Sequence, residues 1–326
     1  MRPAVAVPRP FGRRVTWSPS LTLVPTNGCF NACGYCSFRR IPGQEQVLDP
    51  GGAEARIAAR PQALEVLLLS GEAHPASQER AAWFARLLAL SRLALGCGRL
   101  PHTNAGPLSL REMAALGRLN PSLGLMLEGF GPAYDALHAH APSKRLAVRL
   151  GQLEQAGRLG IPFTTGLLLG VGERRAERLE ALEWLAALQR RWGHIQEVIL
   201  QPWRPDGAQA TPLSPPEQAD LLELIHAARA ILPPEVHLQT PPNLWPLAAL
   251  PAAIAAGIDD LGGIDVGDVI NPAYPQPSPQ ALAAVLAEAG WQLTPRLCVH
   301  RGWWPWLPPA LARRLAPLAA RLSAPA

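Results

Sequence analysis

Three of the five cysteines lie within eight residues, in the pattern C-x-x-x-C-x-x-C. These residues are Cys29, Cys33 and Cys36. They directly follow an apolar run, residues 21–24, that is typical of a buried strand. Three thiolates at this spacing on a loop can converge on one iron–sulfur cluster, and such clusters normally take four protein ligands. Because only three cysteines are grouped here, one iron would remain open to a small molecule.

Two other interpretations of these cysteines remain open at this point. A zinc site usually combines two C-x-x-C-like halves, and the chain has no second half. A disulfide would leave one of the three thiols spare. Cys97 and Cys298 lie in no comparable pattern and are typical of buried free thiols. Cysteines grouped as ligands also fit a reducing cytosol better than a disulfide framework.

The cysteine spacing, with an aromatic residue directly before the third cysteine, resembles that of the radical S-adenosylmethionine (SAM) superfamily. The resemblance implies a [4Fe-4S] cluster on Cys29, Cys33 and Cys36, with SAM bound to the fourth iron through its amino and carboxylate groups. Reduction of such a cluster cleaves SAM to methionine and a 5′-deoxyadenosyl radical, which removes a hydrogen atom from the substrate.

Strand and helix patterns alternate eight times along the chain and must position these groups. The predicted strands are residues 21–26, 64–69, 100–103, 123–128, 161–169, 195–200, 236–240 and 260–264. This alternation predicts an α/β fold with a parallel sheet, and eight repeats favour closure into a (β/α)8 TIM-type barrel. A doubly wound open sheet is the alternative.

The chain length of 326 residues fits one barrel with short extensions. We expect an N-terminal extension over residues 1–14 and the radical SAM barrel over residues 15–275. Residues 276–326 are expected to form a C-terminal helical extension packed on the barrel.

Polar residues follow each predicted strand, where the active sites of such barrels lie. After the cysteine loop they are Ser70–Glu72, His102–Gly106, Glu128, Gly170–Glu173, Gln201, Pro241–Asn243 and Gly262–Asp265. Polar residues gathered at one barrel mouth predict an active site there.

The superfamily resemblance assigns SAM-binding roles to several of these residues. Gly71 and Glu72 lie where relatives hold the SAM amino group, although Ser70 replaces the first glycine of their Gly-Gly-Glu segment. Glu128 lies where relatives bind the SAM ribose hydroxyls. Arg149 lies where biotin-synthase-like relatives place an arginine on the SAM carboxylate, a role that suits the guanidinium fork. A solvated helix arginine is the other interpretation.

The segment Gly166–Glu173 resembles the superfamily's G-x-I-x-G-x-x-E pattern, which packs against the adenine of SAM. Gly170 is one of the glycines of this pattern. A glycine suits the position because it has no side chain and lets the backbone approach a flat ring closely. Tyr35 would offer its backbone to the adenine edge.

His102 and Asn104 follow the third predicted strand, and we predict both as catalytic residues. A histidine of ordinary pKa can carry protons near neutral pH, although His102 can equally be a structural histidine. Asn104, together with Gln201, Asn243 and Asp265, is a candidate for hydrogen bonding to substrate. His138 and Lys144 can be simple surface charges.

Segments along nearly the whole chain resemble one family, the small subunit of 7,8-didemethyl-8-hydroxy-5-deazariboflavin (Fo) synthase, the CofG family. They include Pro25–Asn27, Cys33–Arg39, Leu100–Gly106, Gly124–Glu128, Ile161–Gly166, Gly193–Ile199, Pro241–Leu244 and Gly262–Ile264. The most discriminating are His-Thr-Asn-Ala-Gly at residues 102–106 and Gly-His-Ile-Gln-Glu-Val at residues 193–198.

This resemblance implies a carbon–nitrogen lyase that acts on a tyrosine–pyrimidine adduct, 5-amino-5-(4-hydroxybenzyl)-6-(D-ribitylimino)-5,6-dihydrouracil. Hydrogen abstraction, cyclisation and loss of ammonia would give Fo. The resemblance also implies a separate partner radical SAM subunit that makes the adduct, and an electron donor of the flavodoxin or ferredoxin type.

The formal net charge of +5 could suggest a nucleic-acid partner. However, 29 of the 30 basic residues are arginine, which together with abundant alanine and proline indicates a GC-rich coding sequence. No basic cluster alternates with aromatic residues as in single-strand binders. The chain also shows no secretory signal and no apolar span of membrane length, so we expect a cytoplasmic protein without nucleic-acid or membrane partners.

Two alternative functions remain. The first is another barrel-type radical SAM enzyme, such as the partner Fo subunit or an enzyme of the menaquinone-pathway type; sulfur insertion would need a second cluster, and no second cysteine set exists. The second is a non-catalytic iron–sulfur or zinc-binding module.

Overall fold

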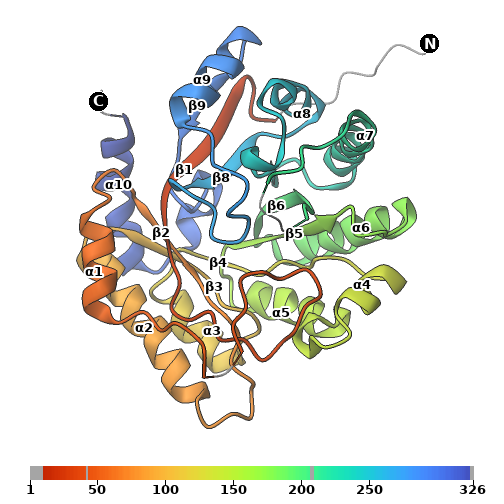
Figure 1. The fold of residues 1–326 in the computed structure, drawn as a ribbon. Helices are drawn as coiled ribbons and strands as arrows, with labels where there is room; N and C mark the ends of the chain where they lie inside the picture. Colours follow the sequence, from red (N-terminus) through yellow and green to blue (C-terminus); the bar gives the residue numbers. More distant parts are fainter. Residues whose placement is uncertain (1–9, 42, 206–208, 324–326) are drawn as a thin grey trace, which may run out of the picture.

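The computed structural model describes residues 10–41, 43–205 and 209–323, and its centre is a closed barrel of parallel strands (Figure 1). The barrel strands are β1 (Arg14–Leu23), β2 (Glu65–Leu69), β3 (Leu100–Asn104), β4 (Ser122–Gly124), β5 (Phe163–Leu169), β6 (Ile195–Pro202), β7 (His237–Gln239) and β8 (Asp260–Ile264). They follow one another in sequence order around the ring, and parallel pairing of β1 with both β8 and β2 closes it. The predicted (β/α)8 barrel is therefore confirmed, and the open sheet is excluded.

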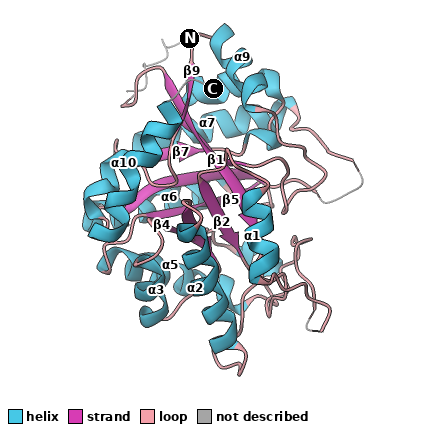
Figure 2. Cartoon of the chain, turned by 90° about the vertical axis from the view of Figure 1, so that its left-hand side faces the viewer, coloured by secondary structure: helices cyan, strands magenta, loops and turns pink. Residues whose placement is uncertain are grey.

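Helices surround the strands on the outside of the barrel (Figure 2). The α-helices are α1 (Pro50–Ala58), α2 (Arg80–Gly96), α3 (Leu110–Gly117), α4 (Pro132–Leu137), α5 (Leu146–Arg158), α6 (Arg175–Trp192), α7 (Pro215–Ile231), α8 (Leu250–Ala256), α9 (Pro279–Glu288) and α10 (Pro309–Ser323). The short 3-10 helices found in the described residues are η1 (Pro142–Lys144), η2 (Pro242–Leu244), η3 (Leu247–Ala249) and η4 (Arg301–Trp306). The main hydrophobic core lies between the strands and these helices.

Local sequence sets several of the helix ends. Ser109 and Glu112 form a reciprocal capping box at the start of α3, and Ser214 with Glu217 does the same for α7. Gly193 ends α6 in the left-handed conformation, with φ of 71°, which glycine adopts without a steric penalty.

The fourth strand is shorter than the predicted residues 123–128. The backbone amides beyond Gly124 still bond toward β5, but irregularly, because the Thr165 hydroxyl takes the place of a carbonyl and accepts the Leu127 amide. Glu128 then turns with φ of 72°, the only non-glycine positive φ in the described chain. The regular ladder therefore stops four residues early, at the point where the chain enters the barrel mouth.

The C-terminal segment contributes more than the predicted helices. Strand β9 (Gln292–Pro295) pairs in parallel with the first four residues of β1, alongside the barrel. After η4, α10 packs its leucines into a second hydrophobic cluster with Leu64, Leu95 and Leu100. Strand β9 was not predicted, because its four partly exposed residues show no clear alternation of apolar and polar side chains. The division into extension, barrel and extension stays a prediction, and residues 1–9 of the first extension lie outside the described residues.

Within the described part of the chain, none of the helices combines the length and apolar character needed to cross a bilayer.

Candidate functional site

A cavity of about 310 Å³ opens at the carboxyl ends of the strands. Most of the residues predicted for the site line it: Cys29, Cys33, Tyr35, Cys36, Gly71, Glu72, Asn104, Glu128 and Arg149. They come from loops after β1, β2 and β4, from the end of β3 and from helix α5. The fold therefore gathers into one cavity residues that are up to 120 positions apart, since Cys29 and Arg149 both line it.

The cysteine loop is fastened to the loop that follows β2. The Gly71 amide donates to the Thr26 carbonyl at 2.7 Å, and the Phe30 amide donates to the Glu72 carbonyl at 3.0 Å. A Cβ on residue 71 would lie 2.1 Å from the Gly28 carbonyl oxygen. Gly71 is thus required for the two loops to touch, and any larger residue would push the cysteine loop away.

A buried network surrounds the Glu72 carboxylate. Asn31, between the first two cysteines, donates its side-chain amide to Glu72 at 2.9 Å and to the Ser143 hydroxyl at 2.9 Å. The Ser143 hydroxyl also donates to Glu72, and Arg149 contacts the other carboxylate oxygen at 3.3 Å. Glu72 is therefore held rigidly beside Cys29 by three residues, from the cysteine loop, η1 and α5.

Arg149 is only 2% exposed, which excludes the interpretation as a solvated helix arginine. Its Nε has no hydrogen-bond partner in the described part of the chain, although it is buried. Its other contacts are long, at 3.3 Å to Glu72 and 3.5 Å to the Met126 carbonyl. A buried guanidinium with unused donors at a cavity wall is suited to receive the carboxylate of a bound small molecule.

A second charged network is built on Glu128. Tyr35 donates its hydroxyl to Glu128 at 2.5 Å, and His138 lies 3.2 Å from the same carboxylate oxygen. Lys144 forms an ion pair with the other oxygen. His138 and Lys144 are therefore not surface charges, because the chain after β4 folds back and buries them against Glu128.

Electrostatics keeps Glu128 ionised. Burial alone would raise the pKa of this carboxyl, but Lys144, the neighbouring His138 and the charge of Arg149 together hold the pKa well below its ordinary value. Positive φ at a non-glycine residue is a strained conformation that persists where surrounding contacts over-determine it, and such residues are frequent in active sites.

The three cysteines line the same cavity and lie together on the loop after β1. Burial raises the pKa of Cys29 and Cys33, that of Cys33 to about 12, so deprotonation needs the positive charge of a bound metal group. All three are free thiols, and the described chain contains no disulfide.

Two predicted residues do not line this cavity. Gly170 lies at the end of β5 with φ of 88°, and its amide donates to Glu173 at 2.8 Å. His102 faces a second cavity deeper in the barrel. Burial lowers the pKa of His102 to about 3, and the Arg296 charge adds to this effect. A pKa this low does not suit a proton carrier near neutral pH, and the catalytic role of His102 stays a prediction.

Two of the substrate-binding candidates also have other tasks. The Asn243 side chain donates to Asp268 and to the Tyr274 carbonyl, while Asp265 accepts the amides of Thr22 and Val266. Both brace the loop after β8, whereas Gln201 does line the cavity.

Sequence reasoning missed Asn31, Ser143 and the tasks of His138 and Lys144. Lys144 is the only lysine of the chain, which could have marked it, since every other cation is arginine. The pairing of His138 and Lys144 with Glu128 depends on the turn at Glu128, and the spacing of these residues along the sequence does not indicate it.

Comparison with known proteins agrees with this geometry. Residues 23–185 match the family model of the radical SAM superfamily. Two solved structures share the fold: the FeFe-hydrogenase maturase HydG from Carboxydothermus hydrogenoformans (TM-score 0.71, 19% identity, covering 93% of this chain and 77% of that one) and methylornithine synthase, PylB (TM-score 0.64, 14% identity, covering 87% and 85%). A closed barrel with three cysteines on the loop after β1, together with this match, defines a radical SAM protein.

Closer relatives narrow the family. A 7,8-didemethyl-8-hydroxy-5-deazariboflavin synthase from Synechococcus elongatus is 51% identical over 290 residues, which is 88% of this chain and 86% of the relative. One from Gloeobacter violaceus is 50% identical over 311 residues, covering 94% and 95%. The chain belongs to the 7,8-didemethyl-8-hydroxy-5-deazariboflavin synthase family, which confirms the resemblance found in the sequence.

Proposed function

We propose that this protein forms the deazaflavin Fo from 5-amino-5-(4-hydroxybenzyl)-6-(D-ribitylimino)-5,6-dihydrouracil. A hydrogen atom is removed from the adduct, the ring closes and ammonia leaves. One further electron and one proton must also be lost to give Fo, and the iron–sulfur cluster would be available to accept the electron. The enzyme is thus a carbon–nitrogen lyase. The observation that carries the proposal is the identity of 50–51% with synthases of this name over nearly the full length of both chains.

The cavity supports this proposal through the groups it offers. Cys29, Cys33 and Cys36 would hold a [4Fe-4S] cluster, and SAM bound at the open iron would supply a 5′-deoxyadenosyl radical on reduction. Glu72 would accept hydrogen bonds from the amino group of SAM, and Arg149, whose Nε has no partner among the described residues, would donate to its carboxylate. Glu128 has two oxygens with capacity beyond their present contacts, so it can also accept ribose hydroxyls.

The remaining walls suit radical chemistry. Leu67, Leu69, Met126, Leu168 and Ile199 line the cavity with apolar surface. An apolar wall without exchangeable protons excludes water from the reacting atoms and leaves few side reactions open to a radical. Asn104 and Gln201 lie on the same cavity and can hydrogen-bond to polar atoms of the adduct.

The proposal includes further components. A separate radical SAM subunit supplies the adduct, a flavodoxin- or ferredoxin-type protein supplies the electron, and the enzyme acts in the cytoplasm.

The test is anaerobic reconstitution with iron and sulfide, followed by incubation with SAM, a reductant and the purified adduct. We expect Fo fluorescence and 5′-deoxyadenosine to appear together. Formation of 5′-deoxyadenosine without Fo would support radical SAM chemistry but contradict the proposed substrate. An intact cluster with neither product would overturn the enzymatic proposal.

A further inference from the structure

A second cavity, of about 150 Å³, lies inside the barrel below the main one. Four residues line both cavities: Leu67, Asn104, Met126 and Ile199. The two spaces therefore adjoin through a shared wall, and we refer to the lower one as the inner chamber. Its volume is several times the 10–15 Å³ that one water molecule needs, so it has room for a short chain of atoms.

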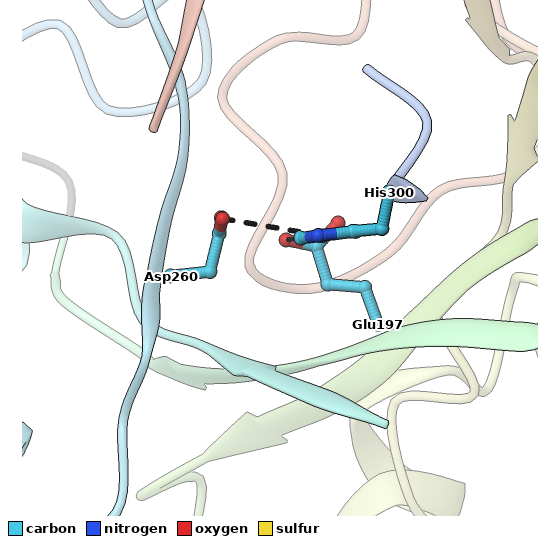
Figure 3. Close-up of side chains that lie close together, drawn as sticks. All are labelled: Glu197, Asp260 and His300. Atoms are coloured by element: carbon cyan, nitrogen blue, oxygen red, sulfur yellow. Dashed lines mark ion pairs between the residues drawn. The ribbon is translucent and has the colours of Figure 1, made fainter. Parts of the chain in front are cut away.

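The floor of the inner chamber is closed by Arg296, which follows β9. Its guanidinium contacts Glu197 at 2.9 Å and both oxygens of Asp260, at 2.7 and 2.5 Å. His300 lies between the same two carboxylates, with its Nε2 4.0 Å from each (Figure 3). Glu197, Asp260 and His300 are grouped as the ligands of a metal ion would be, but the Arg296 guanidinium already supplies a positive charge between the two carboxylates.

The upper part of the chamber differs, because the side chains of Glu65, Gln239 and Asn104 form no ion pair among the described residues. No ion pair within the described residues reaches Glu65, although it is only 6% exposed. The side-chain amides of Gln239 and Asn104 likewise have no hydrogen bond to the described chain, and both line the chamber. Gln239 folds over Gly262, where a Cβ would lie 1.9 Å from its Nε2.

His102 adds an acceptor to the same wall. The Ser122 hydroxyl donates its single hydrogen to the Cys298 carbonyl at 2.9 Å. Ser122 must therefore accept from His102 Nδ1, 2.6 Å away, which leaves a lone pair on Nε2. A Cβ on residue 124 would lie 2.8 Å from this Nε2, so Gly124 keeps the atom accessible. Buried polar groups without partners are costly, and three of them around one cavity, beside a carboxylate that has no ion pair, indicate a polar occupant.

The charge of the chamber restricts that occupant. Glu197 and Asp260 face a single guanidinium, and burial keeps His102 and His300 neutral by lowering the pKa of each. The net charge is therefore negative even when Glu65 is protonated. An anion such as a phosphate or carboxylate would be repelled, whereas a neutral group with several hydroxyls can both donate to Glu65 and His102 and accept from Gln239 and Asn104.

We propose that the inner chamber is the binding site for a neutral polyhydroxylated chain, namely the ribityl group of the substrate. This inference rests on the proposed function, because the adduct brings such a chain. The chain extends from the main cavity past Asn104 and Met126, which places the reacting rings above, beside the cysteine loop. The hydroxyls replace the partners that Glu65, His102 and Gln239 lack within the protein.

The test compares three ligands on the reconstituted enzyme with SAM but without reductant, so that binding is measured apart from turnover. They are the adduct, the same adduct with a methyl group in place of ribityl, and the adduct with a phosphate on the terminal ribityl hydroxyl. We expect the adduct to bind at least a hundredfold more tightly than either analogue, since several hydrogen bonds to buried polar groups are at stake.

Two variants localise the effect. Glu65→Gln keeps the shape of the side chain, and Gln239→Met keeps its length while removing both polar atoms. Each variant should bind the adduct about tenfold more weakly than the wild type does, and its affinity for the methyl analogue should stay within about twofold of the wild-type value. Glu223→Gln, the same substitution at an exposed position on α7, is the matched control and should change neither affinity.

The inference would be overturned if a variant lost affinity equally for the adduct and the methyl analogue, or if neither variant lost affinity for the adduct. Tight binding of the phosphorylated adduct would also overturn it. These outcomes are separate from failure of the proposed function, which appears as absence of Fo when reductant is added to the wild-type enzyme.

Discussion

The mouth and the floor of the barrel both bury charged side chains, but they leave them in opposite states. At the mouth, Arg149 keeps a donor without a partner and Glu128 sits in a strained conformation, and both border a cavity. At the floor, Arg296 is held by three contacts to two carboxylates, inside the barrel and under the C-terminal segment. At the mouth a buried cation keeps a donor free for a ligand, whereas at the floor the donors of the cation are taken up by carboxylates of the protein.

The difference follows from what each region is attached to. Loops after the strands carry the mouth, so their groups can be arranged for binding at a cost in stability. The floor consists of the starts of strands, tied together by Arg296 from a segment that also pairs with β1. We infer that the floor stabilises the fold and the mouth carries the chemistry, with the inner chamber between them. Four substitutions test this division.

The largest expected effect is on activity at the mouth. Cys33→Ala should abolish cluster binding and SAM cleavage, because no other thiol lines the cavity in a position to replace it. The fold should survive, since the cysteine loop is fastened by backbone hydrogen bonds. Iron content and 5′-deoxyadenosine are the readouts, with Cys97→Ala as the matched control. Retained SAM cleavage would contradict the assignment of this thiol.

At the floor, Arg296→Met should destabilise the protein by about 3–5 kcal/mol, because it leaves the carboxylates of Glu197 and Asp260 buried without a cation. Chemical denaturation measures the free energy of unfolding. The exposed pair Arg175–Glu223 supplies the control, since Arg175→Met should cost less than about 1 kcal/mol. Equal losses in the two variants would show that the floor is no more important than a surface ion pair.

Between the two regions, Glu65→Gln should stabilise the protein at high pH. Burial raises the pKa of Glu65 to about 7, so the folded state holds a proton that the unfolded state loses above its ordinary pKa near 4.5. The wild type therefore loses stability as pH rises from about 4.5 through 7, and the glutamine variant does not. We expect a small difference at pH 5 and about 3 kcal/mol at pH 8. A difference that does not grow with pH would refute the buried, unpaired state of Glu65.

The smallest effect concerns SAM itself. Glu128→Gln should weaken SAM binding to the reconstituted protein about tenfold, because a charged acceptor for two hydroxyls becomes a neutral one. Equilibrium binding without reductant measures it, and Glu54→Gln on the exposed side of α1 is the control. Unchanged affinity would contradict a ribose-binding role for Glu128.

Much of the barrel was predictable because its signals are local. Each buried strand is a short apolar run, and β8 has the predicted bounds, residues 260–264. The positions of Glu72, Glu128 and Asn104 also followed from strand ends. The bounds failed at β1, which runs over Arg14–Leu23 instead of the predicted residues 21–26, and at β4, where the Thr165 side chain and the turn at Glu128 replace the regular ladder. Strand β9 was not predicted, because its pairing depends on the neighbouring residues of β1.

The sequence by itself determined the cysteine loop, the strand order and the set of polar residues at the mouth, because these depend on spacing and on the geometry of parallel strands. Only the tertiary structure decided which charges meet. Lys144 reaches Glu128 across 16 residues and Arg296 reaches Glu197 across 99, and Coulomb attraction between buried groups depends on their distance in space, which their separation along the chain does not reveal.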